Sequence, residues 1–201
     1  SKHQSSWDTW SKKEKEWVEE EGPLSKANQA EASYRLYLQA KLYQQWDKLH
    51  RYARSKGIQI VGDLPFYVGY DSCDVWTNQD CFLLDPLSKK PTFIAGVPPD
   101  YFSSTGQRWG NPIYDWDRLQ KDGFRFIIER ILGNAEIYDI LRLDHFRAFD
   151  TYWKIPSSCP TAVDGEWVEA PGYELFDALF KASPHLNIIA EDLGDLRPEV
   201  L

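Results

Sequence analysis

The stretch IYDILRLDHFR, residues 137–147, decides the fold of this chain. Its apolar first half is typical of a buried strand, and the run ends in Asp144 followed by polar residues. The same pattern of a short apolar run that leads into an acidic residue returns twice, in IQIVGDLP at 58–65 and in NIIAEDLG at 187–194. We therefore predict three buried strands, each with an acidic residue at its carboxyl end.

Helical patterns precede these strands. The clearest predicts a helix over 29–56 that Gly57 ends, and shorter ones cover 125–132 and 174–182. The apolar face of the long helix is formed by Leu38, Leu42, Trp46, Leu49 and Ala53. Alternating helices and strands predict an α/β fold with a parallel sheet, and such sheets carry their chemistry at the carboxyl ends of the strands.

The length of 201 residues fits one domain over 1–201. Within it, residues 1–28 are interpreted as a polar helical lead-in. Residues 66–124, rich in Pro, Gly, Asp and aromatic side chains, are interpreted as a long active-site loop insertion between strands, since so long a loop is more often functional than idle.

The net charge, the number of cysteines and the absence of several known motifs exclude some classes of function. The net charge of −8 disfavours nucleic acid as a partner. No apolar run is long enough for a membrane span and the first residues do not resemble a signal peptide, so no membrane association is expected. Three cysteines cannot all pair, which favours a reducing cytoplasm. The four scattered histidines predict no metal site, and no phosphate-binding glycine motif or serine-nucleophile motif occurs.

Asp144 and Glu191 are the candidate catalytic residues. If their strands are neighbours in one parallel sheet, both carboxyl groups face the same cleft, and glycosyl transfer needs such a pair: one acid attacks or stabilises the anomeric carbon, and the other protonates the leaving oxygen. Glu191 would have to carry the proton, with Ile189, Ala190 and nearby aromatic residues supplying an apolar environment. The alternative is that both acids cap helices.

Arg142 lies two residues before Asp144 and therefore shares its strand face. Its guanidinium could hold Asp144 ionised and fix its rotamer, or it could form a structural ion pair only.

The segment 98–112 carries three aromatic residues on a loop rich in Gly, Ser and Pro, which we expect to form neither a helix nor a long strand. Gln107 and Asn111 add amides that suit sugar hydroxyls, although a loop pinned by its own aromatic residues is equally compatible with the pattern. The chain's 9 Trp, 11 Tyr and 10 Phe suit sugar stacking as well, but composition alone favours a core role.

Five motifs in order resemble the 4-α-glucanotransferases (amylomaltases or disproportionating enzymes) of glycoside hydrolase family 77. Together they span about residues 46–201. They are GDLPFYV with the following DVW, GVPPDYF, GQRWGNP, RLDHFR and AEDLG, which begin at residues 62, 96, 106, 142 and 190. Residues 1–45 carry no confident match.

The resemblance implies part of a (β/α)₈ barrel of the α-amylase superfamily and a retaining mechanism without metal or organic cofactor. By the resemblance, Asp144 is the nucleophile, Glu191 the general acid/base and Arg142 the residue that orients the nucleophile, while Asp63 supports the site. The loop residues that the resemblance implies over the acceptor side are Tyr101, Phe102, Gln107 and Trp109. Asp100 and Asn111 of the same segment are also predicted to bind substrate. The implied substrates are maltooligosaccharides and α-1,4-glucans, handled in the cytoplasm.

The family's third carboxylate, an Asp that follows a His on a later strand, has no counterpart in this sequence, and three strands cannot close a barrel of about 250 residues. We therefore expect an internal fragment whose exposed sheet edges are covered by another copy or by rearranged packing. Two other functions stay open: an α-glucan hydrolase of the same superfamily, and a noncatalytic glucan-binding module.

Overall fold

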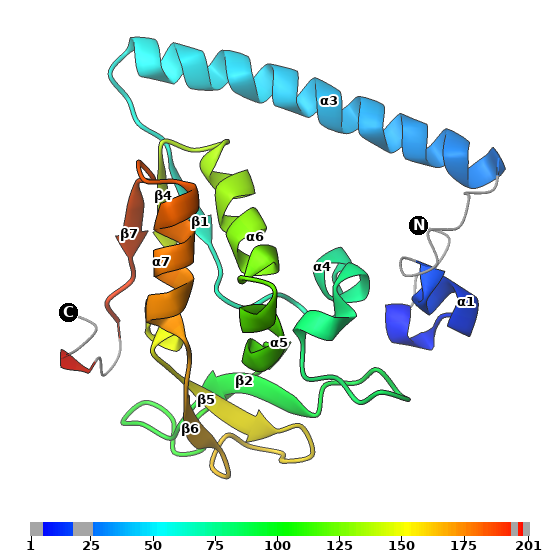
Figure 1. The fold of residues 1–201 in the computed structure, drawn as a ribbon, viewed down its shortest axis with the longest axis vertical. Helices are drawn as coiled ribbons and strands as arrows, with labels where there is room; N and C mark the ends of the chain where they lie inside the picture. Colours follow the sequence, from blue (N-terminus) through cyan, green and yellow to red (C-terminus); the bar gives the residue numbers. More distant parts are fainter. Residues whose placement is uncertain (1–5, 18–25, 194–196, 199–201) are drawn as a thin grey trace.

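The computed structural model describes residues 6–17, 26–193 and 197–198. Part of the predicted polar lead-in, residues 1–5 and 18–25, lies outside these residues. Two sheets organise the part of the chain from β1 onward. A parallel sheet has the strand order β1-β4-β7, and an antiparallel sheet has the order β3-β2-β5-β6. The two sheets lie toward opposite ends of the molecule in Figure 1.

The three predicted strands form the parallel sheet: β1 (Val61–Leu64), β4 (Ile140–Leu143) and β7 (Ile188–Ala190). β4 pairs with β1 on one side and with β7 on the other, and Asp63 stands opposite Arg142 in the register. The α/β prediction and the expected neighbourhood of the strands before Asp144 and Glu191 are therefore confirmed.

Helices cover one face of this sheet. α6 (Arg125–Ala135) and α7 (Gly172–Ala182) run alongside the strands in Figure 1. Ile131, Leu141 and Leu179, each at most 1 % exposed, belong to the same core cluster. The apolar positions that predicted these two helices thus lie on the faces that the helices bury against the sheet.

The opposite face of the parallel sheet is open, so the prediction of fully buried strands was wrong. Val61 is 51 % exposed and Ile189 is 46 % exposed, whereas the alternate residues Gly62 and Leu64 are buried. In a closed barrel this face would point inward and be covered by the remaining strands. The three parallel strands of the described residues leave it uncovered.

The long helix α3 (Lys26–Ser55) lies along one side of the molecule. Gly57 follows it with φ +71°, the left-handed conformation of a helix stop. The predicted apolar face is mostly exposed: Leu42 is 65 % exposed and Leu49 is 54 % exposed. The described residues cover this face only near the carboxyl end of the helix, where Ala53 is buried.

Asp139, the residue before β4, binds side chains at the carboxyl end of α3. Its carboxylate accepts a hydrogen bond from the Ile60 amide at 2.8 Å and pairs with His50 Nε2 at 2.8 Å and Arg54 Nε at 2.5 Å. These contacts, with the Ile60 amide the largest, lower the pKa of Asp139 to about 2. Trp46 adds a hydrogen bond to the Ile137 carbonyl at 2.9 Å.

The lead-in packs more closely than its polar composition indicated. It contains η1 (Trp7–Thr9) and α1 (Lys12–Lys15), which begins with a capping box formed by Ser11 and Glu14. Trp7 is only 2 % exposed and donates to the Tyr70 carbonyl at 2.8 Å. The interpretation of residues 1–28 as a polar lead-in did not include this buried tryptophan.

Residues 66–124 contain regular structure. They include α4 (Cys73–Thr77), η2 (Gln79–Cys81), β2 (Phe93–Val97), β3 (Gln107–Pro112) and α5 (Trp116–Lys121). β2 pairs with β3 and with β5 (Thr151–Pro156), which in turn pairs with β6 (Glu166–Glu169). The segment 98–112 forms no long strand, as expected, but its second half forms the six-residue strand β3 because β2 supplies a pairing partner for it.

Candidate active site

One arginine forms ion pairs with the acidic residues at the carboxyl ends of the three parallel strands. Arg142 Nη1 lies 2.6 Å from Asp63 Oδ1 and 3.0 Å from Asp144 Oδ1, and Nη2 lies 2.9 Å from Glu191 Oε1. The register explains this meeting, since Asp63 and Arg142 are direct partners and both point to the open face. These acids, with the Asp63 contact the largest cause, raise the pKa of Arg142.

Asp144 lies at the open mouth of this site. Its amide donates to the Leu64 carbonyl at 3.0 Å, which extends the β4–β1 pairing by one residue and fixes the backbone of the acid. The side chain is 40 % exposed, so one oxygen contacts Arg142 while the group remains accessible to a ligand. A carboxylate beside a guanidinium and open to solvent is suited to act as a nucleophile.

Glu191 is the more enclosed acid of the pair, with a side chain 15 % exposed. Its amide donates to the Leu143 carbonyl at 3.1 Å, and its Oε2 accepts the His145 amide at 2.5 Å. The expectation that Ile189 and Ala190 give Glu191 an apolar environment was wrong, because both residues are exposed. Arg142 and the His145 amide hold the carboxyl group instead. These two polar contacts fix the orientation of the carboxyl group.

His145 joins the two acids to the aromatic loop. It adopts φ 50° and ψ 47°, and its ring meets Trp109 edge-on with ring centroids 4.9 Å apart. Burial lowers the pKa of its imidazole. No sequence signal revealed that the His145 amide contacts Glu191.

The loop residues fall into two groups. Tyr101 and Phe102 are 97 % and 91 % exposed, whereas Trp109 is 39 % exposed and lies against His145. Gln107 accepts the Trp109 indole N–H at 3.0 Å. The first two rings are therefore free to meet a ligand, and the third is placed beside the acids.

The side chains of Asp100 and Asn111 form hydrogen bonds with backbone groups in this structure. Asp100 Oδ1 accepts the amides of Phe102 and Ser103 at 2.9 and 2.7 Å. Asn111 donates to the Val68 carbonyl at 2.9 Å. These contacts stabilise the loop, and the structure does not bring either side chain into contact with Asp144 or Glu191.

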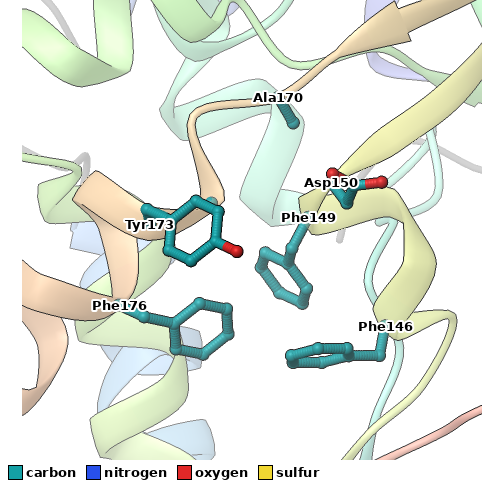
Figure 2. A pocket seen from close by; sticks show the side chains of 7 residues that line it. Phe146, Phe149, Asp150, Ala170, Tyr173 and Phe176 are labelled. Atoms are coloured by element: carbon teal, nitrogen blue, oxygen red, sulfur yellow. The ribbon is translucent and has the colours of Figure 1, made fainter. Parts of the chain in front are cut away.

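An apolar cavity of about 190 Å³ opens between η3 (Phe146–Phe149) and the start of α7 (Figure 2). It is lined by Phe146, Phe149, Asp150, Ala170, Gly172, Tyr173 and Phe176. Phe149 and Phe176 pack together with centroids 5.1 Å apart, and Arg197 binds Asp150, which lowers the pKa of that carboxyl. None of the acids at Arg142 lines this cavity, so the two features are distinct.

Other kinds of site find little support. Cys73, Cys81 and Cys159 are unpaired thiols. Within residues 6–17, 26–193 and 197–198, no group of His, Cys, Asp and Glu side chains could hold a metal ion. No helix in the same ranges is both long and apolar enough to cross a membrane.

Comparison with known proteins places this chain in one family. A profile of the family described as 4-alpha-glucanotransferase, glycoside hydrolase family 77, matches residues 1–201. The chain belongs to this family. A 4-alpha-glucanotransferase of Aquifex aeolicus is 53 % identical over 167 residues, which cover 83 % of this chain and 34 % of that protein.

Among solved structures, an amylomaltase from Streptococcus agalactiae in complex with acarbose aligns with a TM-score of 0.79 and 41 % identity. The match covers 97 % of this chain and 40 % of that one. A relative from Solanum tuberosum, named chloroplastic/amyloplastic, is 50 % identical over 157 residues, 78 % of this chain and 27 % of the relative. The chain thus spans about a third of the length of its curated family members, and its fold is part of a barrel.

Proposed function

We propose that this chain is the part of a 4-α-glucanotransferase that carries the nucleophile and the general acid/base. One observation carries the proposal: Arg142 binds Asp144 and Glu191 through the two terminal nitrogens of a single guanidinium, at 3.0 and 2.9 Å. Acids held so close favour the carboxyl spacing of retaining enzymes, about 5–5.5 Å, over the wider spacing of inverting ones.

The reaction then proceeds in two displacements. Asp144 attacks the anomeric carbon of an α-1,4-glucan, and Glu191 gives its proton to the departing 4-oxygen. An acceptor hydroxyl next loses its proton to Glu191 and attacks the same carbon, which releases Asp144. Arg142 and the His145 amide orient the carboxyl group of Glu191 for these two proton transfers.

The choice of a sugar as acceptor is supported by the aromatic loop. Tyr101 and Phe102 expose almost their whole rings, and Trp109 of the same loop reaches His145 beside Asp144. Exposed aromatic rings of this kind suit the apolar faces of glucose units. Asp100 would support the loop by binding its backbone, and Gln107 by binding the Trp109 indole. Asn111 would tie the loop to the Val68 carbonyl.

The chain is proposed to work within a longer protein. Residues outside it would cover the open face of β1, β4 and β7 and supply the family's third carboxylate, and a second copy would cover that face if this chain is isolated. The three unpaired cysteines favour a reducing compartment such as the cytoplasm, although the potato relative is named for plastids.

The experiment uses the full-length protein that contains this chain and maltotriose as substrate. Transfer predicts glucose together with products longer than maltotriose, whereas hydrolysis yields only shorter ones. Asp144→Asn and Glu191→Gln should abolish turnover and keep glucan binding. Asp177→Asn, which alters an acid on α7 away from the cluster at Arg142, is the matched control and should retain activity. Full turnover by both site variants would refute the proposal and favour a binding module.

A further inference from the structure

His145 has a backbone conformation that is uncommon for residues other than glycine. Its φ of 50° and ψ of 47° place it in the left-handed region, which side chains with a Cβ usually avoid. Lys89 and Phe124 are the other described non-glycine residues with positive φ. His145 alone among these three lies between the two candidate catalytic acids, since it follows Asp144 in sequence and contacts Glu191.

The left-handed turn has a direct consequence for Glu191. It aims the His145 amide at Glu191 Oε2, 2.5 Å away, while Arg142 Nη2 holds Oε1 at 2.9 Å. Each oxygen of the carboxyl group therefore has its own donor. The preceding amide, that of Asp144, points instead to the Leu64 carbonyl at 3.0 Å. Consecutive amides thus fix the nucleophile's backbone and the acid/base's side chain.

Aromatic packing holds this turn in place. The imidazole lies edge-on to Trp109 at 4.9 Å between ring centroids, and Tyr67 and Phe66 lie at 6.1 and 6.4 Å. Burial lowers the pKa of the imidazole, which keeps the ring neutral and compatible with its aromatic neighbours. A strained backbone persists where surrounding packing over-determines it, and such strain gathers at functional sites.

We propose that His145 is a positioning residue for Glu191: its left-handed backbone, held by Trp109, places the amide that orients the acid/base. The inference rests on the proposed function. The His145 ring itself transfers no proton in this scheme. The orientation of Glu191 depends on the backbone angle φ of residue 145. The side chain at this position acts only by tolerating a positive φ and by packing against its neighbours.

The test compares substitutions that differ in this tolerance, in the full-length protein. Gly and Asn accept the left-handed region, whereas Val, branched at Cβ, resists it. We expect His145→Val to lower kcat on maltotriose by about 10–100-fold, a part of the 10²–10⁴ that general acid–base catalysis contributes. His145→Gly and His145→Asn should recover most of that loss, and KM should change little. If the valine variant does not fold, His145→Ala takes its place, with the same order expected.

A second substrate separates positioning from general damage. Fluoride leaves α-maltosyl fluoride without needing a proton, so the first-turnover release of fluoride does not depend on Glu191 as an acid. His145→Val should therefore release this first fluoride at nearly the wild-type rate. Lys89→Val is the matched control, because Lys89 has φ 61° outside the acid cluster, and it should leave both reactions unchanged.

The outcomes are distinguishable. Equal losses on maltotriose and on the fluoride, or a glycine variant as slow as the valine variant, would overturn the positioning role while leaving the proposed function intact. A wild-type protein that transfers no glucan at all would refute the proposed function itself.

Discussion

Replacing Arg142 is the most informative perturbation of the acid cluster. Its Nη1 lies 2.6 Å from Asp63 and 3.0 Å from Asp144, and its Nη2 lies 2.9 Å from Glu191. Arg142→Lys keeps the charge but replaces a planar fork by one ammonium group, which cannot reach acids on both sides. Arg142→Met keeps an extended side chain and removes the charge.

The expected magnitude follows from the hydrogen bonds that each substitution removes. A single preorganised donor at a reacting centre is worth about 10²–10³ in kcat. Arg142→Met removes both donors to the catalytic pair and leaves three acids without their common cation, so kcat should fall by at least about 10²–10³. Arg142→Lys, which can retain one of these hydrogen bonds, should lower kcat by about tenfold to 10². KM should change less, because the fork binds the protein's own acids.

The assay follows glucose release and chain elongation from maltotriose by the full-length protein. Arg118 provides a matched control, since its side chain is 37 % exposed against 32 % for Arg142 and also pairs with two acids, Asp80 at 2.7 Å and Asp122 at 2.8 Å. Arg118→Met should leave kcat near the wild-type value. The reasoning is refuted if Arg142→Met keeps kcat within about threefold of wild type, or if Arg118→Met lowers kcat as much.

Three further outcomes test the fold and the extent of the site. Because the pKa of Asp139 is lowered to about 2, its contribution to stability is present above the ordinary value near 4 and is lost as the pH falls toward 2. When urea unfolding is measured between pH 6 and 2.5, the free energy of unfolding should therefore fall less for Asp139→Asn than for the wild type. An equal fall in both proteins would contradict this. Leu141→Ala, at a residue 1 % exposed, should cost about 2–5 kcal/mol in chemical denaturation, against less than about 0.5 kcal/mol for the same substitution at the 92 % exposed Leu87. The isolated 201 residues should release only traces of glucose from maltotriose, and robust release would show that no further carboxylate is needed.

The parallel sheet could be predicted because its signals are local. The runs before Asp63, Asp144 and Glu191 are short and apolar, and helical periodicity separates them, so a parallel arrangement follows from general rules of α/β folds. Their one-sided burial could not be predicted, since apolar runs do not reveal how many strands the sheet contains.

The antiparallel sheet was not predicted because part of its pairing is distant in sequence. Ile94 of β2 stands opposite Ile155 of β5, and the elements between them in sequence include β4 of the other sheet. Gln107–Pro112, with its glycine and proline, has weak strand propensity and becomes β3 through its pairing with β2. Tertiary contacts thus override the local signal at this segment.

The candidate site was predictable in its residues but not in its contacts. Alternation along β4 places Arg142 on the face that leads to Asp144, and the strand order brings Glu191 beside them. The polar environment of Glu191 depends on the left-handed turn at His145, for which the sequence holds no distinct signal. The predicted apolar environment failed because Ile189 and Ala190 are exposed and Arg142 and the His145 amide hold the carboxyl group of Glu191.

The most direct test of the central claim is to find which residue becomes bound to sugar. Full-length protein carrying Glu191→Gln, incubated with α-maltosyl fluoride, should form the glycosyl-enzyme by loss of fluoride and then stall, because no base activates the acceptor. Peptide mass spectrometry should locate a maltosyl ester on Asp144. A sugar attached to another residue, or a protein that turns over the fluoride without any trapped ester, would contradict the assignment of Asp144 and Glu191 as the working pair.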